Sequence, residues 1–128
     1  MSSKGRPYRT VVVEGWQVLI GRGSEDNDYL TFEVAEPGDL WLHVGGGTAG
    51  SHVVISNPDK TEVPRSVLER AAAFAAWYSK ARGAPRVEVD YCHARDVSKP
   101  RGAHAGLVEL RKWKCIKVAP APAEGEEG

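Results

Sequence analysis

The sequence predicts an α+β domain, in which one or two helices pack on one face of a mostly antiparallel sheet. Two observations lead to this class. Short β-branched segments recur along the chain between glycines and prolines, which is typical of antiparallel strands joined by turns. Residues 64–82 have instead the apolar spacing of a helix. At 128 residues, the chain is long enough for one hydrophobic core.

The N-terminal third begins with a predicted hairpin. Residues 9–20, RTVVVEGWQVLI, are two β-branched runs separated by Glu14-Gly15. Ser24 then precedes an acidic stretch, as suits the N-cap and first turn of a helix. The following residues 29–36, YLTFEVAE, fit a strand and a helix equally well, because their apolar positions match both periods.

A glycine-rich segment joins two further predicted strands, over residues 39–45 and 51–56. The connection, GGGTAG over residues 45–50, lacks the lysine and the helix start of a Walker-type phosphate loop. Glycine does permit positive φ and close approach of a ligand. The segment is therefore either a plain hairpin turn or a loop whose N–H groups meet a phosphate or a base.

Residues 64–82 contain the clearest helix, with Pro64 at its first position and Gly83 at its C-terminal cap. Its buried stripe is Val67, Ala71, Phe74 and Tyr78. Residues 86–92 then alternate as a strand, residues 95–106 read as a loop, and residues 107–110 and 112–118 give one or two short strands. The expected organisation is a flexible segment 1–8, a domain 9–119 and a disordered acidic tail 120–128.

The bulk properties exclude several classes of protein. No apolar run approaches the roughly 20 residues that span a bilayer, and the polar N-terminus lacks the apolar region of a signal peptide. Two cysteines, Cys92 and Cys115, do not make a disulfide framework. We therefore expect a cytoplasmic monomer with reduced thiols and no membrane contact.

Histidines and cysteines raise the question of a metal or catalytic site. If Leu40 and Leu42 face the core, then Trp41 and His43 share the opposite face, and His52 opens the next strand nearby. Adding Cys92, His93, His104 and Cys115 would supply zinc ligands, but no pair has the usual ligand spacing. A triad of Ser51, His52 and Asp39 lacks a nucleophile elbow. We expect no metal, no cofactor and no catalytic residue.

A basic tract occupies residues 95–117, although the net charge of the chain is zero. It holds seven basic residues against two acidic residues, a local charge of +5, whereas residues 22–62 hold two basic and eight acidic residues. Tyr91, His93, His104 and Trp113 are interleaved with these cations. Cations for phosphates and flat rings for bases are the combination that RNA surfaces use, and the turn at residues 99–102 is expected to expose its charges.

Several motifs follow one another in order along residues 9–119. They are Gly21-Arg22 with Asn27-Asp28; Asp39-Leu-Trp41-Leu-His43; Gly50-Ser51-His52-Val-Val; Ala71-Ala72 and Tyr78-Ser79-Lys80; Asp96-Val97-Ser98-Lys99-Pro100; and Gly102-Ala103 with Gly106. This ordered set resembles the NFACT-R domain, the RNA-binding domain of the NFACT proteins of ribosome-associated quality control. The GGGTA turn departs from the short polar, proline-containing stretch usual in that family.

The resemblance implies a non-enzymatic RNA-binding module. NFACT proteins carry this domain beside a glycosylase-like domain, helix-hairpin-helix motifs and a coiled coil, bind the large ribosomal subunit with tRNA and extend stalled nascent chains. This sequence shows none of those parts and resembles the stand-alone bacterial form, which implies a role in tRNA modification rather than chain elongation. The family pattern also favours a helix over about residues 25–35.

The resulting expectation is a sheet with a long helix over 64–82 and a shorter helix over about 25–35, binding tRNA or ribosomal RNA. A tRNA-modification enzyme or the large ribosomal subunit is the expected further partner. Alternatives are an RNA-modifying enzyme using His43 and His52, and a protein-docking module; for both histidines a structural role and RNA contact stay open. The expected RNA-binding residues are Arg22, His43, Ser51, His52, Arg95, Lys99, Arg101, His104, Arg111, Lys112, Trp113 and Lys114.

Overall fold

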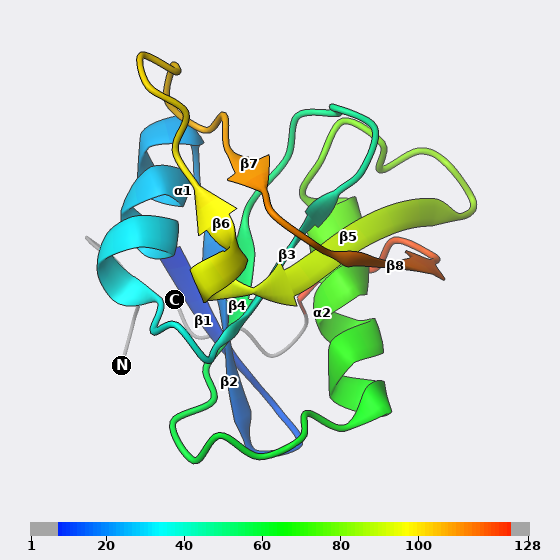
Figure 1. Cartoon of the computed structure of the whole chain (residues 1–128). Helices are drawn as coiled ribbons and strands as arrows, with labels where there is room; N and C mark the ends of the chain where they lie inside the picture. The colour runs from blue at the N-terminus through cyan, green and yellow to red at the C-terminus, as the bar shows by residue number, and fades with distance from the viewer. Residues whose placement is uncertain (1–7, 124–128) are drawn as a thin grey trace.

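The computed structural model describes residues 8–123, and within them six strands form one sheet that is antiparallel throughout (Figure 1). The spatial order of the strands is β1-β2-β4-β3-β5-β8. Their bounds are Tyr8–Val13 for β1, Trp16–Gly21 for β2, Val53–Ile55 for β4, Leu40–Val44 for β3, Val87–His93 for β5 and Lys114–Val118 for β8. The predicted fold class is confirmed, as are the hairpins β1–β2 and β3–β4.

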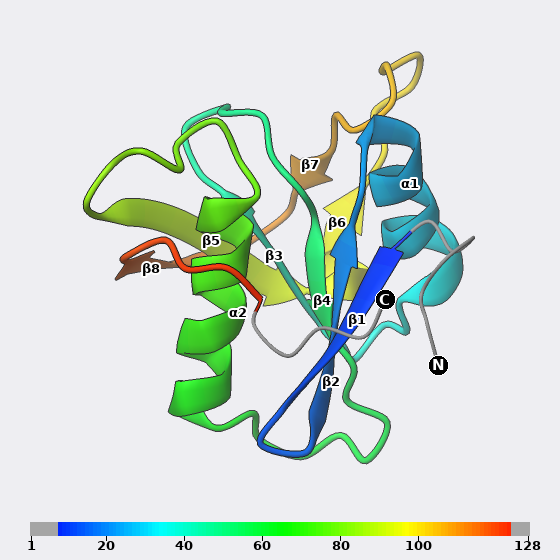
Figure 2. The same cartoon turned by 180° about the vertical axis from the view of Figure 1, so that it is seen from behind.

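The helices lie on opposite faces of the sheet, so the prediction that they share one face is wrong. Helix α2, Arg65–Trp77, covers one face. Helix α1, Ser24–Tyr29, and the π-helical turn Leu30–Val34 cover the other face, beside the small sheet of β6, Val97–Ser98, and β7, Glu109–Leu110 (Figures 1 and 2). The 3₁₀ turn Ala94–Asp96 leads into β6.

Two covers are needed because the sheet is apolar on both faces. Successive side chains of a strand point to opposite faces. Leu42 accordingly packs in the core under α2, whereas its neighbour Trp41 packs in the second core with Leu30. Trp41 is 1% exposed, so the prediction that its face holds Trp41 and His43 is correct, but that face is largely buried. The predicted second helix is confirmed as α1 and its π-helical turn.

The long helix is shorter than predicted. The predicted stripe is right, since Val67, Ala71 and Phe74 are fully buried and Tyr78 packs on the same core. Pro64 is the N-cap rather than the first helical residue, and the helix ends at Trp77 instead of residue 82. The helix stops at Trp77 because the backbone of the next residues makes tertiary hydrogen bonds instead of helical ones. The backbone of residues 78–80 pairs with the glycine-rich loop, through Ser51 N–H to Tyr78 O at 2.9 Å and Lys80 N–H to Ala49 O at 3.0 Å.

The ends of the described chain belong to the domain. Tyr8 already lies in β1, although it was expected in the flexible segment. At the other end, Ala121 N–H donates to Ala73 O at 3.2 Å, and Ala123 is buried. Residues 120–123 therefore lie against α2 rather than in a tail, and residues 1–7 and 124–128 of the expected flexible segments lie outside the described residues. Over residues 8–123, no helix is long and apolar enough to cross a membrane.

Candidate functional site

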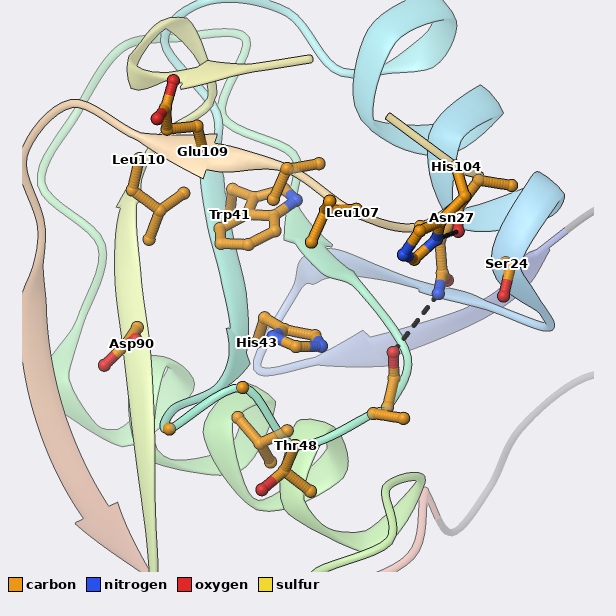
Figure 3. Close-up of a pocket in the computed structure, with 18 of the residues that line it drawn as sticks. Ser24, Asn27, Trp41, His43, Thr48, Asp90, His104, Leu107, Glu109 and Leu110 are labelled. Atoms are coloured by element: carbon orange, nitrogen blue, oxygen red, sulfur yellow. Dashed lines mark hydrogen bonds between the residues drawn. The ribbon is translucent and has the colours of Figure 1, made fainter. Parts of the chain in front are cut away.

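A groove of about 500 Å³ opens on the sheet face opposite α2 (Figure 3). One wall is the glycine-rich loop, and the other is the segment that leads into β7. Figure 3 shows Asp90 at one end, Ser24, Asn27 and His104 at the other end, and His43 between them. The groove is thus lined by residues of the DLWLH motif, by Gly50 of the GSHVV motif and by residues 104–110 and Trp113 of the basic tract.

A row of polar side chains crosses the sheet at the floor of the groove. His43 of β3 pairs with Asp90 of β5, which pairs in turn with Cys115 of β8. The Cys115 thiol donates to Asp90 Oδ1 at 3.2 Å, and this hydrogen bond is the main cause that raises the pKa of Cys115 to about 11. On the other side, the rings of His43 and His52 lie 5.2 Å apart in an edge-to-face arrangement. The predicted proximity of the two histidines is confirmed.

His52 is the buried end of this row, with a side chain that is 1% exposed. Its Nδ1 lies 2.8 Å from Thr31 Oγ1, which also accepts the indole N–H of Trp41 at 3.0 Å. Because the Thr31 oxygen already accepts from Trp41, its own O–H is available to donate to His52 Nδ1. Burial, followed by the neighbouring His43, lowers the pKa of His52 to about 4. We therefore infer that His52 is neutral and has a structural role.

His43 is half-buried and faces the groove. Its ring stacks on Trp41 with 5.9 Å between ring centroids. Burial lowers the pKa of His43 below its usual value, against smaller opposing effects of backbone groups and Asp90. At neutral pH the floor of the groove therefore presents an uncharged imidazole, which can donate from one nitrogen and accept at the other.

The wall of the groove is fixed by side chains of α1 and by the strand that follows the loop. Asn27 donates from Nδ2 to Gly50 O at 3.2 Å, shown as the dashed line in Figure 3, and its Oδ1 accepts the backbone N–H of His52 at 3.1 Å. Ser51 Oγ donates to Gly21 O at 2.7 Å. Asn27 and Ser51 thus hold the loop against the sheet, which gives Ser51 a structural role.

The glycine-rich loop owes its composition to geometry. Gly46 and Gly47 have φ of +70° and +77°, the left-handed region that glycine occupies without strain. Gly50 packs so closely on the residues after α2 that a Cβ atom there would lie 2.5 Å from Cβ of Ser79. The positive φ angles and the close contact at Gly50 account for the glycines of a hairpin turn. The outer edge of the loop lines the groove.

Two cations of the basic tract are held by carboxylates. Lys99 Nζ lies 2.9 Å from Asp28 Oδ2 and donates to the carbonyls of His104 and Leu107 at 2.6 and 2.9 Å. The ammonium of Lys99 therefore folds the 99–107 loop onto α1 instead of projecting from the turn. Arg111 Nε donates to Asp96 Oδ1 at 3.0 Å and is the main cause that lowers the pKa of the buried Asp96. The side chain of Arg111 is still 72% exposed.

Trp113 forms a ridge between the groove and a second hollow. Its side chain is 52% exposed and lines both depressions. The second hollow is also lined by Tyr91, His93, Lys112 and Lys114. Both lysines are exposed, as are Arg95, Arg101 and His104. The structure thus places Tyr91, His93 and two of the seven cations of the tract, Lys112 and Lys114, around the exposed indole of Trp113.

Arg22 lies apart from this ridge, in a hollow on the far side of the glycine-rich loop. That hollow is also lined by Ser51 and by two cations that follow α2, Lys80 and Arg82. Neither cation is among the predicted RNA-binding residues, because residues 78–82 were expected to continue the helix, although Tyr78-Ser79-Lys80 is one of the family motifs. Asp90, Leu107 and Glu109 of the groove were not predicted either, since nothing in a strand pattern distinguishes a groove residue from an ordinary exposed one.

The structure does not assemble the catalytic triad considered above. Asp39 is buried and accepts backbone N–H groups of Asn57 and Glu36 at 2.7 and 2.9 Å, so its carboxylate organises a loop. Cys92 is also buried, and burial raises the pKa of its thiol to about 12. Among residues 8–123, no group of three or more His, Cys, Asp or Glu is placed to hold a metal ion.

Comparison with known proteins explains the order of the motifs. The profile of the NFACT protein RNA binding domain matches residues 6–111. The chain belongs to this family. The resemblance noted in the sequence is thereby confirmed, and it covers most of the described fold.

Several relatives share this domain. Proteins named "Rqc2 homolog RqcH" from Streptococcus suis and Bacillus subtilis are 38% and 37% identical over 116 and 122 residues, or 90% and 91% of this chain. "Ribosome quality control complex subunit 2" of Saccharomyces cerevisiae is 32% identical over 74% of the chain. The chain spans 20%, 21% and 9% of these relatives' own lengths, respectively.

A solved structure has the same fold. The C-terminal part of the fibronectin/fibrinogen-binding protein of Streptococcus suis matches with a TM-score of 0.83 and 37% identity. The match covers 92% of this chain and 47% of that one. The matched Streptococcus suis chain, of which this domain makes up about half, therefore contains the same fold.

Proposed function

We propose that this chain is a non-enzymatic module that binds tRNA or ribosomal RNA on the surface around Trp113. The observation that carries the proposal is the half-exposed indole placed between the exposed cations Lys112 and Lys114, in a hollow with Tyr91 and His93. Covering the apolar surface of an exposed aromatic side chain lowers the free energy of a complex, so such a ring favours binding of a partner. Unpaired bases stack on such rings while neighbouring lysines contact phosphates.

The family and the relatives support an RNA partner and a place in ribosome quality control. The domain family is described by its RNA binding, and the yeast relative is named as a subunit of the ribosome quality control complex. We propose the large ribosomal subunit or its tRNA as the target, in ribosome quality control. The alternative role is in tRNA modification. The direct RNA contacts proposed are Lys112, Trp113, Lys114, Arg95 and Arg101, while Lys99, Ser51 and His52 shape the site.

The test is a titration of labelled tRNA at several salt concentrations. Binding should weaken with a log–log slope of about −0.7 to −0.9 for each phosphate contacted. Changing Lys112 and Lys114 together to Ala should weaken binding and flatten that slope by about one to two units. A double change of Lys99 and Arg101 is a poorer test, since Lys99 also holds its loop to Asp28.

The matched control is the double variant Lys60→Ala/Arg70→Ala. Both side chains are exposed and neither lines the groove or the hollow beside Trp113, so the control removes the same charge elsewhere. Equal loss in the two double variants would mean that only net charge matters. If the wild type does not bind at low salt, the RNA-binding proposal fails and a protein-docking module takes its place.

A further inference from the structure

The groove beside Trp113 differs in charge from the surface around it. Among residues 8–123, no lysine or arginine lines it, whereas the acidic residues Asp90 and Glu109 do. Its remaining walls combine apolar and aromatic side chains, such as Trp41, Leu107 and Leu110, with loop glycines. Other polar side chains also line it, namely Ser24, Asn27, His43, Thr48 and His104. A phosphate would meet two like charges there without a compensating cation. The groove therefore does not fit the RNA backbone.

The same features fit a nucleobase. The volume of about 500 Å³ is within the roughly 300–1,000 Å³ of sites for small molecules, and such sites combine apolar walls with a few directed polar groups. Trp113 forms a wall of both the groove and the basic hollow. An RNA strand whose phosphates lie on the cations of the hollow can therefore extend one unpaired base over the indole into the groove.

Building on the proposed RNA binding, we propose that the groove takes one unpaired guanine of the bound RNA and that Asp90 recognises it. Guanine presents two adjacent N–H donors, N1–H and the 2-amino group, which match the two oxygens of a carboxylate. Adenine and cytosine pair an amino donor with a ring nitrogen acceptor, and uracil flanks its single donor with carbonyls. Each of these places an acceptor against the carboxylate, which rejects it.

Asp90 is held in place for this role. Its Oδ1 accepts the Cys115 thiol at 3.2 Å, which leaves further lone pairs on both oxygens for a ligand. The carboxylate lies so close to the loop that a Cβ atom at Gly45 would be 3.1 Å from Oδ1. Asp90 is also inside β5, between two paired strands, so its backbone is fixed by the sheet. The uncharged ring of His43 lies beside it on the neighbouring strand.

The experiment uses stem-loop RNAs with a uridine loop in which one position is G, A, C, U or inosine. Dissociation constants are measured with the whole chain at one salt concentration. The G loop should bind roughly tenfold more tightly than the U loop, and inosine, which lacks only the 2-amino group, should lose most of this preference. The inosine comparison changes the RNA alone, so it does not depend on the folding of any variant.

Two variants assign the preference to Asp90. Asp90→Asn should abolish the preference for G and keep salt-dependent binding, because it replaces one acceptor oxygen by an NH₂ donor, which would face one of the two N–H groups of guanine. Glu88→Gln removes the same charge from the same strand at an exposed position outside the groove, and should keep the preference. Salt-dependent binding without base preference in the wild type, or a preference that survives Asp90→Asn, overturns this inference and leaves the RNA-binding proposal intact. No binding of any loop overturns both.

Discussion

Thr31 Oγ1 lies 2.8 Å from Nδ1 of His52 in the buried layer between α1 and the sheet. The same oxygen accepts the indole N–H of Trp41 at 3.0 Å. One hydroxyl therefore satisfies the polar groups of two buried aromatic residues. Charging the ring would put a proton on Nδ1, so the Thr31 hydroxyl would have to turn its own hydrogen away from the ring, in surroundings that cannot solvate an imidazolium.

This arrangement predicts a loss of stability in mild acid. The pKa of His52 is about 4 in the folded protein and 6.5 in the unfolded chain, so the unfolded chain binds more protons between these values. The free energy of unfolding is then full above pH 6.5 and falls by up to about 3 kcal/mol as the pH drops to 4. Denaturant unfolding at pH 7.5 and 4.5, followed by tryptophan fluorescence, measures the difference.

His52→Asn tests whether His52 causes this dependence. The Asn carbonyl oxygen can take the place of Nδ1 as acceptor of the Thr31 hydroxyl, but it does not titrate. Whatever its stability at pH 7.5, this variant should lose much less stability than the wild type on acidification. Burial also lowers the pKa of His43, which contributes in the same direction. An undiminished pH dependence would exclude His52 as its source.

Phe74 is fully buried on α2 and anchors the helix on the sheet. Phe74→Ala should reduce the free energy of unfolding by about 3–5 kcal/mol, because it removes a buried ring and leaves a cavity. The matched control is Phe32→Ala, which truncates a ring that is 37% exposed and should cost less than about 1 kcal/mol. Chemical denaturation of both variants at neutral pH gives the comparison. Similar costs would contradict the packing described for α2.

Gly50 must remain glycine because of its contact with Ser79. Gly50→Ala places a methyl group 2.5 Å from Cβ of Ser79 and should reduce the free energy of unfolding by about 1–3 kcal/mol. Gly83→Ala is the control: a Cβ atom there meets nothing within 4 Å, so stability should stay the same or rise by up to about 1 kcal/mol. In thermal unfolding, the melting temperature of Gly50→Ala should therefore fall, whereas that of Gly83→Ala should stay the same or rise.

Trp113 should matter for RNA and little for folding. Trp113→Ala should weaken tRNA binding by about 1–3 kcal/mol if a base stacks on the indole. Its free energy of unfolding should stay within about 0.5 kcal/mol of the wild type, since the ring is 52% exposed. The control is Val12→Ala, which removes exposed apolar surface from β1, at the opposite edge of the sheet from β8. Val12 is 64% exposed, and this change should alter neither RNA binding nor stability. Unfolding of the Trp113 variant would identify the indole as a structural residue.

Local patterns determined the elements of the fold. β-Branched runs with glycine and proline between them were enough to predict the hairpins β1–β2 and β3–β4, and the stripe from Val67 to Phe74 was enough to place α2. These features depend on residues close together in the sequence. The order of motifs along the chain, such as Asp39 to His43, was enough to indicate the family.

The partners of each side chain were decided only by tertiary structure. The end of α2 depends on Gly50, which brings the loop against Ser79 and offers hydrogen bonds that a sequence window around the helix does not contain. In the same way, Lys99 was predicted to be an exposed charge but meets Asp28, which is 71 residues away in the chain. Periodicity reports which face of an element is apolar. It cannot report which distant carboxylate a lysine will meet, because that depends on how the faces pack.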